Sequence, residues 1–281
     1  MANELKEKRV GIALGGGGIR GLAHIPILKV LDDLDIQPAA VTGTSMGAIV
    51  GALYATGMSA ENIETKVREH ILLRKDNFKS FIKKSKHLIN WVRVFAPEMD
   101  RGGLVDADGL FQYLFDELLD LNFEDLSIPF LAVTTDYYSA EAVVFREGAL
   151  LQAVLASMSV PGVFAPQVID GKTLVDGGLV NNLPYDFLPP EINCCIAVEL
   201  TNLPKKRSDR KPPRTLDVAT AAIDIMQVAT LRGKLESNPP DILVCPVLEN
   251  VGMFDFHKIE YVLAQGEKAA EHLKATLHTL L

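Results

Sequence analysis

Ser45 is the residue of this sequence whose surroundings most clearly indicate chemistry. It lies in Gly43-Thr44-Ser45-Met46-Gly47, which has the G-x-S-x-G pattern of a nucleophile elbow. An apolar run, Ala39-Ala40-Val41, precedes it, and a run of small and apolar residues follows. This order predicts a strand, a sharp turn carrying the serine, and a helix whose amino end favours negative charge. The flanking glycines would let strand and helix approach closely. The alternative is an ordinary glycine-rich turn.

A second glycine-rich turn comes earlier in the chain, after the apolar run Val10 to Leu14. Three of its glycines fit the G-x-G-x-x-G pattern of dinucleotide-binding proteins, which also need an acidic residue at the end of the next strand. Here the next strand leads into Ser45 instead. In a hydrolase, the successive N–H groups of Gly16, Gly17 and Gly18 would form an oxyanion hole. We prefer the oxyanion hole to the nucleotide site.

Arg20 lies in the same glycine-rich turn. A guanidinium at this position would bind a phosphate or a carboxylate of a substrate. The alternative role is that of an arginine on a helix surface. We therefore carry Arg20 forward as a candidate substrate-binding residue.

A serine nucleophile needs a group that takes its proton. Among the six histidines, only His257 follows a late predicted strand in a loop, the place where a triad histidine would stand. Asp176 is better placed, because it ends a short predicted strand and is followed by Gly177-Gly178. A carboxylate within hydrogen-bond reach of Ser45 can act as the base directly. The alternative is that this aspartate merely begins a turn.

The elements that must position these residues alternate along the chain, which predicts an α/β fold with a mostly parallel sheet. We expect strands at residues 10–14, 39–42, 128–135, 142–145, 172–175, 193–200 and 242–245. We expect helices at residues 22–34, 59–73, 106–119, 148–157, 215–235 and 257–281. The 281 residues exceed the roughly 100–200 of a typical domain, and we expect one domain over residues 1–281.

Composition narrows the class of protein. The net charge of −8 argues against nucleic acid as a partner. The three cysteines, at positions 194, 195 and 245, match neither a disulfide framework nor a zinc site, and buried free thiols indicate a reducing compartment. The polar start lacks a secretory signal, and no apolar run reaches the ~20 residues of a membrane span. We expect a cytoplasmic protein.

The segment from Arg74 to Arg93 differs from the rest of this acidic chain. It has seven basic residues and one acidic residue, a local charge of +6, together with the single tryptophan, Trp91. Its apolar residues recur at helical spacing, which favours a lid or a membrane-facing insertion at residues 74–100 and a peripheral contact with a membrane surface. The alternative is a basic helix packed on the body of the protein.

Three motifs occur in a fixed order and resemble those of the patatin-like phospholipase family, most closely its bacterial members. They are Gly16-Gly17-Gly18-Ile19-Arg20-Gly21, Gly43-Thr44-Ser45-Met46-Gly47 and Asp176-Gly177-Gly178. The loop from Pro161 to Pro166 and the stretch Asn181-Asn182-Leu183-Pro184 are also similar to that family. The likeness extends from about Val10 to Pro184.

This resemblance implies a three-layer α/β/α fold and a Ser45–Asp176 dyad without histidine. It also implies an oxyanion hole at Gly16, Gly17 and Gly18, and activity on lipid acyl esters with no metal or cofactor. The expected enzyme is a serine esterase of the phospholipase A or lysophospholipase type, with a phospholipid or lysophospholipid substrate. The alternative is a regulatory or binding protein that keeps the fold with little lipid turnover. The head group, the chain length and the oligomeric state do not follow from the sequence.

Overall fold

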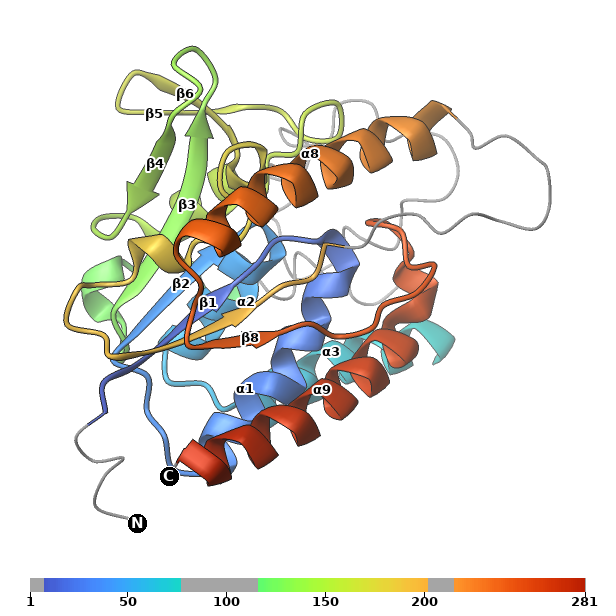
Figure 1. Ribbon diagram of the computed structural model, residues 1–281. Coiled ribbons are helices and arrows are strands. Elements are labelled where there is room, and N and C mark those ends of the chain that lie inside the picture. The colour runs from blue at the N-terminus through green and yellow to red at the C-terminus, as the bar shows by residue number, and fades with distance from the viewer. Residues whose placement is uncertain (1–7, 77–115, 202–214, 281) are drawn as a thin grey trace.

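The computed structural model describes residues 8–76, 116–201 and 215–280. Within these ranges eight strands form one sheet (Figure 1). They are β1 (Val10–Leu14), β2 (Ala40–Thr44), β3 (Phe130–Asp136), β4 (Ala142–Phe145), β5 (Gln167–Ile169), β6 (Lys172–Asp176), β7 (Cys194–Val198) and β8 (Ile242–Val244). The helices that pack on this sheet are α1 (His24–Asp33), α2 (Met46–Ala55), α3 (Ala60–Asp76), α7 (Leu150–Ser157), α8 (Thr215–Ser237) and α9 (Ile259–Leu280).

The sheet has a parallel part and an antiparallel part. Its order is β5-β6-β3-β2-β1-β7-β8, and β4 also pairs with β3. Five neighbouring strands, β3, β2, β1, β7 and β8, are parallel to one another. β4 and β6 run antiparallel to β3, and β5 runs antiparallel to β6. The predicted α/β class and the mostly parallel sheet are confirmed, with an antiparallel arm at one side.

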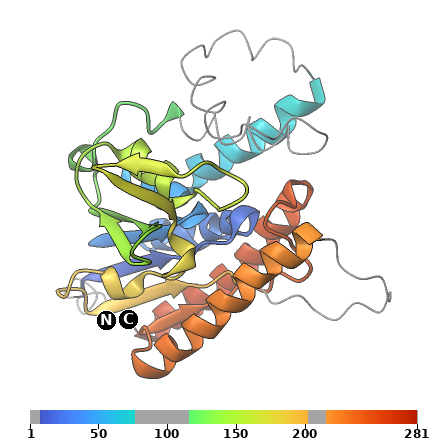
Figure 2. The same cartoon turned by 90° about the horizontal axis from the view of Figure 1, so that it is seen from above.

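The two faces of the sheet are covered very differently. Side chains alternate along β1 and β7, so that Ile12 and Ile196 belong to the large core and Ala13 and Ala197 to a small one. Helices α1, α2, α3, α7 and α9 supply the large core. On the other face, the described helix α8 lies over the sheet (Figures 1 and 2), and its Leu231 joins Leu183 and Tyr185 in the small cluster. The arrangement has three layers, and one outer layer is much thinner than the other.

Several expectations differ in detail from the structure. The strand β5 was not predicted, and the first helix begins as a 3₁₀ helix over Gly18–Ala23 before α1. Most of the basic segment, including Trp91, and most of the helix expected at 106–119 lie outside the described residues. None of the helices in the described part of the chain has the length and apolarity needed to cross a bilayer.

Candidate active site

Ser45 occupies a strained turn between β2 and α2. Its φ of 55° and ψ of −124° lie in a region that residues with a side chain seldom adopt. The turn is also tight, because a Cβ added to Gly43 would lie 2.4 Å from the carbonyl oxygen of Gly47. A Cβ on Gly47 would lie 2.1 Å from the carbonyl oxygen of Leu14 in β1. The two glycines of the predicted elbow are therefore needed for close approach, as the sequence indicates.

The topology of the sheet brings Asp176 to Ser45. The pairing of β4 with β3 overlaps those of both β2 and β6, so β4 occupies one side of β3 and the other two strands share the opposite side. Along that side Thr44, the last residue of β2, faces Val133, and Asp176 faces the next residue, Thr134. The carboxyl ends of β2 and β6 thus meet end to end, with the serine at one end and the aspartate at the other.

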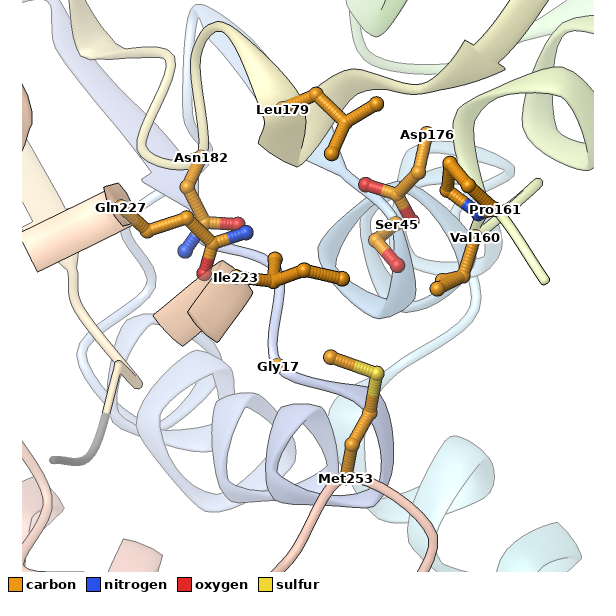
Figure 3. Close-up of a pocket in the computed structure, with 10 residues that line it drawn as sticks. All are labelled: Gly17, Ser45, Val160, Pro161, Asp176, Leu179, Asn182, Ile223, Gln227 and Met253. Atoms are coloured by element: carbon orange, nitrogen blue, oxygen red, sulfur yellow. The ribbon is translucent and has the colours of Figure 1, made fainter. Parts of the chain in front are cut away.

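The carboxyl group of Asp176 is buried, and the residue is only 6% exposed. Its Oδ1 accepts a hydrogen bond from the N–H of Gly178 at 2.7 Å. Burial raises the pKa of Asp176 to about 6, and the nearby Ser45 hydroxyl and the Gly178 N–H oppose this rise (Figure 3). The other carboxyl oxygen, Oδ2, has no hydrogen-bond partner in the described part of the chain. This oxygen is free to take a proton.

Two serines at the end of α7 connect the halves of the site, and sequence reasoning missed both. The Ser157 hydroxyl accepts the N–H of Ser45 at 2.9 Å and donates to the carbonyl of Val133 at 2.6 Å. The carbonyl of Ser159 accepts the N–H of Asp176 at 2.9 Å. The last residue of α7 and the turn after it therefore fix the backbone at both candidate catalytic residues. The only sequence signal was the loop similarity that begins next to these serines.

The glycine-rich turn lies beside Ser45, but its first candidate donor is already used. The N–H of Gly16 donates to the carbonyl of Asn182 at 3.0 Å. Among the described residues, the N–H groups of Gly17 and Gly18 have no such backbone partner. Gly17 also lines the hollow at Ser45. The predicted oxyanion hole is therefore narrowed from three glycines to Gly17 and Gly18, and it stays a prediction.

Arg20 does not stand where a substrate-binding residue should, which corrects the expectation from the sequence. The residue is 1% exposed, so it is neither on a helix surface nor open to a ligand. Its Nη1 and Nη2 donate to both carboxylate oxygens of Asp224 in α8, at 3.2 and 2.7 Å. Its Nε donates to the carbonyl of Gly17 at 2.9 Å. The guanidinium thus forms its hydrogen bonds inside the protein, where it connects the glycine turn to α8.

A small hollow, partly open to solvent, lies over Ser45 (Figure 3). Its wall comes from the glycine turn after β1, the serine elbow, the turn after α7, the end of β6 with the loop that follows it, α8, and the loop before α9. It is lined by Gly17, Ser45, Val160, Pro161, Asp176, Leu179, Asn182, Ile223, Gln227 and Met253. His257 is exposed in a separate 3₁₀ helix over Phe256–Lys258 and does not line this hollow. A triad through His257 therefore has no support in the geometry.

No group of three or more histidine, cysteine or acidic side chains that would hold a metal ion occurs within the described ranges. The acidic side chain in the hollow, Asp176, stands with apolar and amide-bearing neighbours rather than with further carboxylates. The site thus consists of a strained serine, a buried carboxyl group and a glycine-rich turn.

These features define a nucleophile-elbow site whose serine faces an aspartate. Residues 12–189, more than half of the chain, match the family described as patatin-like phospholipase. The chain belongs to the patatin-like phospholipase family.

Curated relatives agree with this assignment. An uncharacterized NTE family protein of Mycobacterium tuberculosis is 34% identical over 176 residues, which cover 63% of this chain and 44% of that protein. Patatin-like phospholipase domain-containing protein 6 of Mus musculus is 32% identical over 193 residues, which cover 66% of this chain and 13% of that protein. The chain thus spans less than half the length of these relatives.

A solved structure shares the fold. VipD from Legionella pneumophila superposes with a TM-score of 0.53 at 14% identity, over 96% of this chain and 67% of that chain. At this identity the likeness concerns the fold alone.

Proposed function

We propose that this protein is a serine carboxylic ester hydrolase that acts on lipid acyl esters, with Ser45 as nucleophile and Asp176 as base. The observation that carries the proposal is the end-to-end meeting of β2 and β6 on β3. Support comes from the strained backbone of Ser45 at this meeting point and from the buried carboxyl group of Asp176, one oxygen of which has no partner among the described residues. The pKa of Asp176, raised to about 6, makes this carboxylate a stronger base than an exposed one.

The reaction proceeds in two halves. The Ser45 hydroxyl oxygen attacks the acyl carbonyl carbon while Asp176 takes its proton, and the N–H groups of Gly17 and Gly18 bind the oxyanion. As the intermediate collapses, the alcohol leaves and takes the proton from Asp176, which yields an acyl-enzyme. Water then attacks the acyl carbonyl, Asp176 accepts its proton, and the fatty acid leaves as Ser45 is reprotonated.

The family assignment supports a lipid as the acyl donor. The size of the hollow limits which part of that lipid it can hold. The space that atoms leave empty in it, about 270 Å³, includes solvent outside the hollow. The enclosed part is therefore too small for a whole phospholipid. We therefore place the acyl chains and the head group of the lipid outside the hollow. The type of enzyme that we propose is a phospholipase A or a lysophospholipase, and we treat residues 1–281 as one hydrolase domain.

Covalent labelling tests this proposal directly. A fluorophosphonate should label the wild-type protein at Ser45 alone, as peptide mass spectrometry would show, and Ser45→Ala should not be labelled. A panel of p-nitrophenyl esters, lysophospholipids and diacyl phospholipids should then reveal hydrolysis of at least one lipid. Labelling elsewhere would move the nucleophile. A protein that binds lipid but is neither labelled nor active would be a binding or regulatory member of the family.

A further inference from the structure

Three consecutive carbonyl groups of the glycine turn are each held by a different side chain, two from the helix that follows the turn and one from the loop after β6. All three side chains are buried. The contacts are His24 Nε2 with Gly15 O at 2.8 Å, Asn182 Nδ2 with Gly16 O at 3.3 Å, and Arg20 Nε with Gly17 O at 2.9 Å. The mechanism proposed above uses none of these side chains. Their shared target is a run of four glycines, the residue type whose backbone dihedrals are least restricted.

Holding a carbonyl also sets the direction of the next N–H group. The peptide unit is planar and trans, so the C=O of one residue and the N–H of the following residue point in opposite directions. The contact of Asn182 with the Gly16 carbonyl thus orients the N–H of Gly17. Likewise, the contact of Arg20 with the Gly17 carbonyl orients the N–H of Gly18. These are the two donors proposed for the oxyanion hole.

Arg20 is itself oriented by α8. Both oxygens of Asp224 accept hydrogen bonds from its guanidinium, and the side chain of Asp224 is only 12% exposed. A bidentate pair of this kind fixes the plane of the guanidinium and therefore the direction of its Nε. Asp224 is 204 residues distant from Arg20 in the sequence, so this constraint is supplied entirely by the tertiary fold.

We propose that Asp224 is a positioning residue, which acts through Arg20 to orient the Gly17–Gly18 peptide and so the oxyanion hole. The inference rests on the function proposed above. It makes α8 part of the catalytic apparatus although Asp224 does not line the hollow at Ser45. Energetics point the same way, because a buried ion pair adds little to stability compared with apolar side chains of similar volume. A role in orienting the turn accounts for the pair where stability does not.

The first test is Asp224→Asn, which keeps the size of the side chain and removes one strong acceptor. On a soluble p-nitrophenyl ester, kcat should fall on the order of 10- to 100-fold, less than the roughly 10²–10³ that follows removal of a donor. KM should change by less than ~3-fold, because the oxyanion forms only after the ester is bound. Asp224→Glu, which keeps the charge, should recover part of the loss.

A second measurement separates the oxyanion hole from general damage. A trifluoromethyl ketone adds to a serine hydroxyl and turns its carbonyl oxygen into an oxyanion, so its inhibition constant reports on the hole. This constant should rise in Asp224→Asn by about the same factor by which kcat/KM falls. Asp32→Asn is the matched control, since Asp32 also holds two neighbours, Tyr54 and Ala60, but lies at the far end of α1. It should lower Tm without changing kcat or the inhibition constant.

The decisive variant is the double change Arg20→Met with Asp224→Leu, which replaces the buried pair by apolar side chains. Stability should be kept or increased, while kcat stays low because the side-chain hydrogen bond to the Gly17 carbonyl is lost. Burial already raises the pKa of Glu199, which lies near Arg20, so this acid can stay neutral when the arginine is removed. A purely structural role for the pair predicts the opposite, full activity in a stable protein.

The outcomes are distinguishable from failure of the proposed function. If wild-type protein hydrolyses no ester and is not labelled at Ser45, the proposed function fails. If wild-type protein is active but Asp224→Asn, folded by circular dichroism, keeps kcat within about twofold, the positioning role is wrong. Full activity in a stable double variant would overturn it as well.

Discussion

The two faces of the central sheet hold the active site in different ways. On one face, five helices bury a continuous apolar core against β1 and β7. On the other, the described part of α8 has a small apolar cluster beneath it and makes several hydrogen bonds to the turns of the site. Besides Asp224, Gln227 donates to the carbonyl of Gly178 at 3.0 Å, and Lys234 donates to the carbonyl of Leu183 at 2.6 Å. We call the face with the large core the packed face and the opposite one the α8 face. The packed face carries the nucleophile elbow, and the α8 face supports the glycine turn and the turn after Asp176.

This difference teaches where stability and activity reside. Apolar burial contributes free energy of unfolding in proportion to area and is not directional. Hydrogen bonds contribute less net stability but fix angles. We therefore expect changes on the packed face to lower stability with little effect on turnover, and changes on the α8 face to lower turnover with little effect on stability.

The largest effect on turnover should come from Ser45 and Asp176, the proposed nucleophile and base. Ser45→Ala and Asp176→Asn should each reduce ester hydrolysis by roughly 10⁴-fold or more, and about equally, because members of one catalytic unit are not additive. Both should remain folded by circular dichroism. His257→Ala is the control and should keep most of the activity, since His257 is exposed and does not line the hollow. An inactive His257→Ala would overturn the dyad.

A matched pair of truncations compares the faces themselves. Ile27 of α1 is fully buried in the large core, and Leu231 of α8 is 9% exposed in the small one. Ile27→Ala should cost about 2–5 kcal/mol of unfolding free energy in urea, with kcat unchanged where the protein is folded. Leu231→Ala should cost less and lower kcat several-fold, because α8 loosens over the site. If the two variants lost stability and turnover in the same proportion, the two faces would not differ in the way proposed here.

The pH dependence should identify the base. The buried carboxylate of Asp176 must be ionised to accept the proton of Ser45, so kcat/KM should fall as the pH drops through its pKa of about 6. His24, the buried histidine near the site, cannot cause this limb, because burial lowers its pKa to about 4. The profile of His257→Ala should be the same. A flat profile from pH 5 to 8 would show that Asp176 does not act as the base.

The sequence predicted those parts of the site that depend on local constraints. A strained serine and close approach of two backbones require glycine at fixed spacing, so the elbow could be seen in five residues. The position of Asp176 was predicted as the end of a short strand, although its meeting with β2 required the sheet topology. The function of Arg20 was predicted wrongly, because a guanidinium in a glycine turn looks the same whether it faces a ligand or a distant aspartate. Its partner, Asp224, carried no local signal at all.

The smallest expected effect concerns a third region, the basic segment from Arg74 to Arg93, whose greater part lies outside the described residues. Neither face of the sheet explains how an acidic protein would reach a lipid aggregate. A stretch with a charge of +6 would be attracted to an anionic surface by about 1 kcal/mol for each well-placed base. Its apolar side chains would then enter the head-group region.

Trp91 is the single tryptophan, so its fluorescence reports on this segment alone. Its emission should shift to the blue with anionic vesicles, less with neutral vesicles, and return in high salt, because a surface interaction is screened. Changing Lys79, Lys83, Lys84 and Lys86 together to glutamate should remove the shift and slow hydrolysis of vesicles. Turnover of a soluble ester should be spared, since both faces of the sheet stay intact. Emission that is unchanged by either vesicle would mean that the segment does not meet the lipid, and that substrate reaches Ser45 by another route.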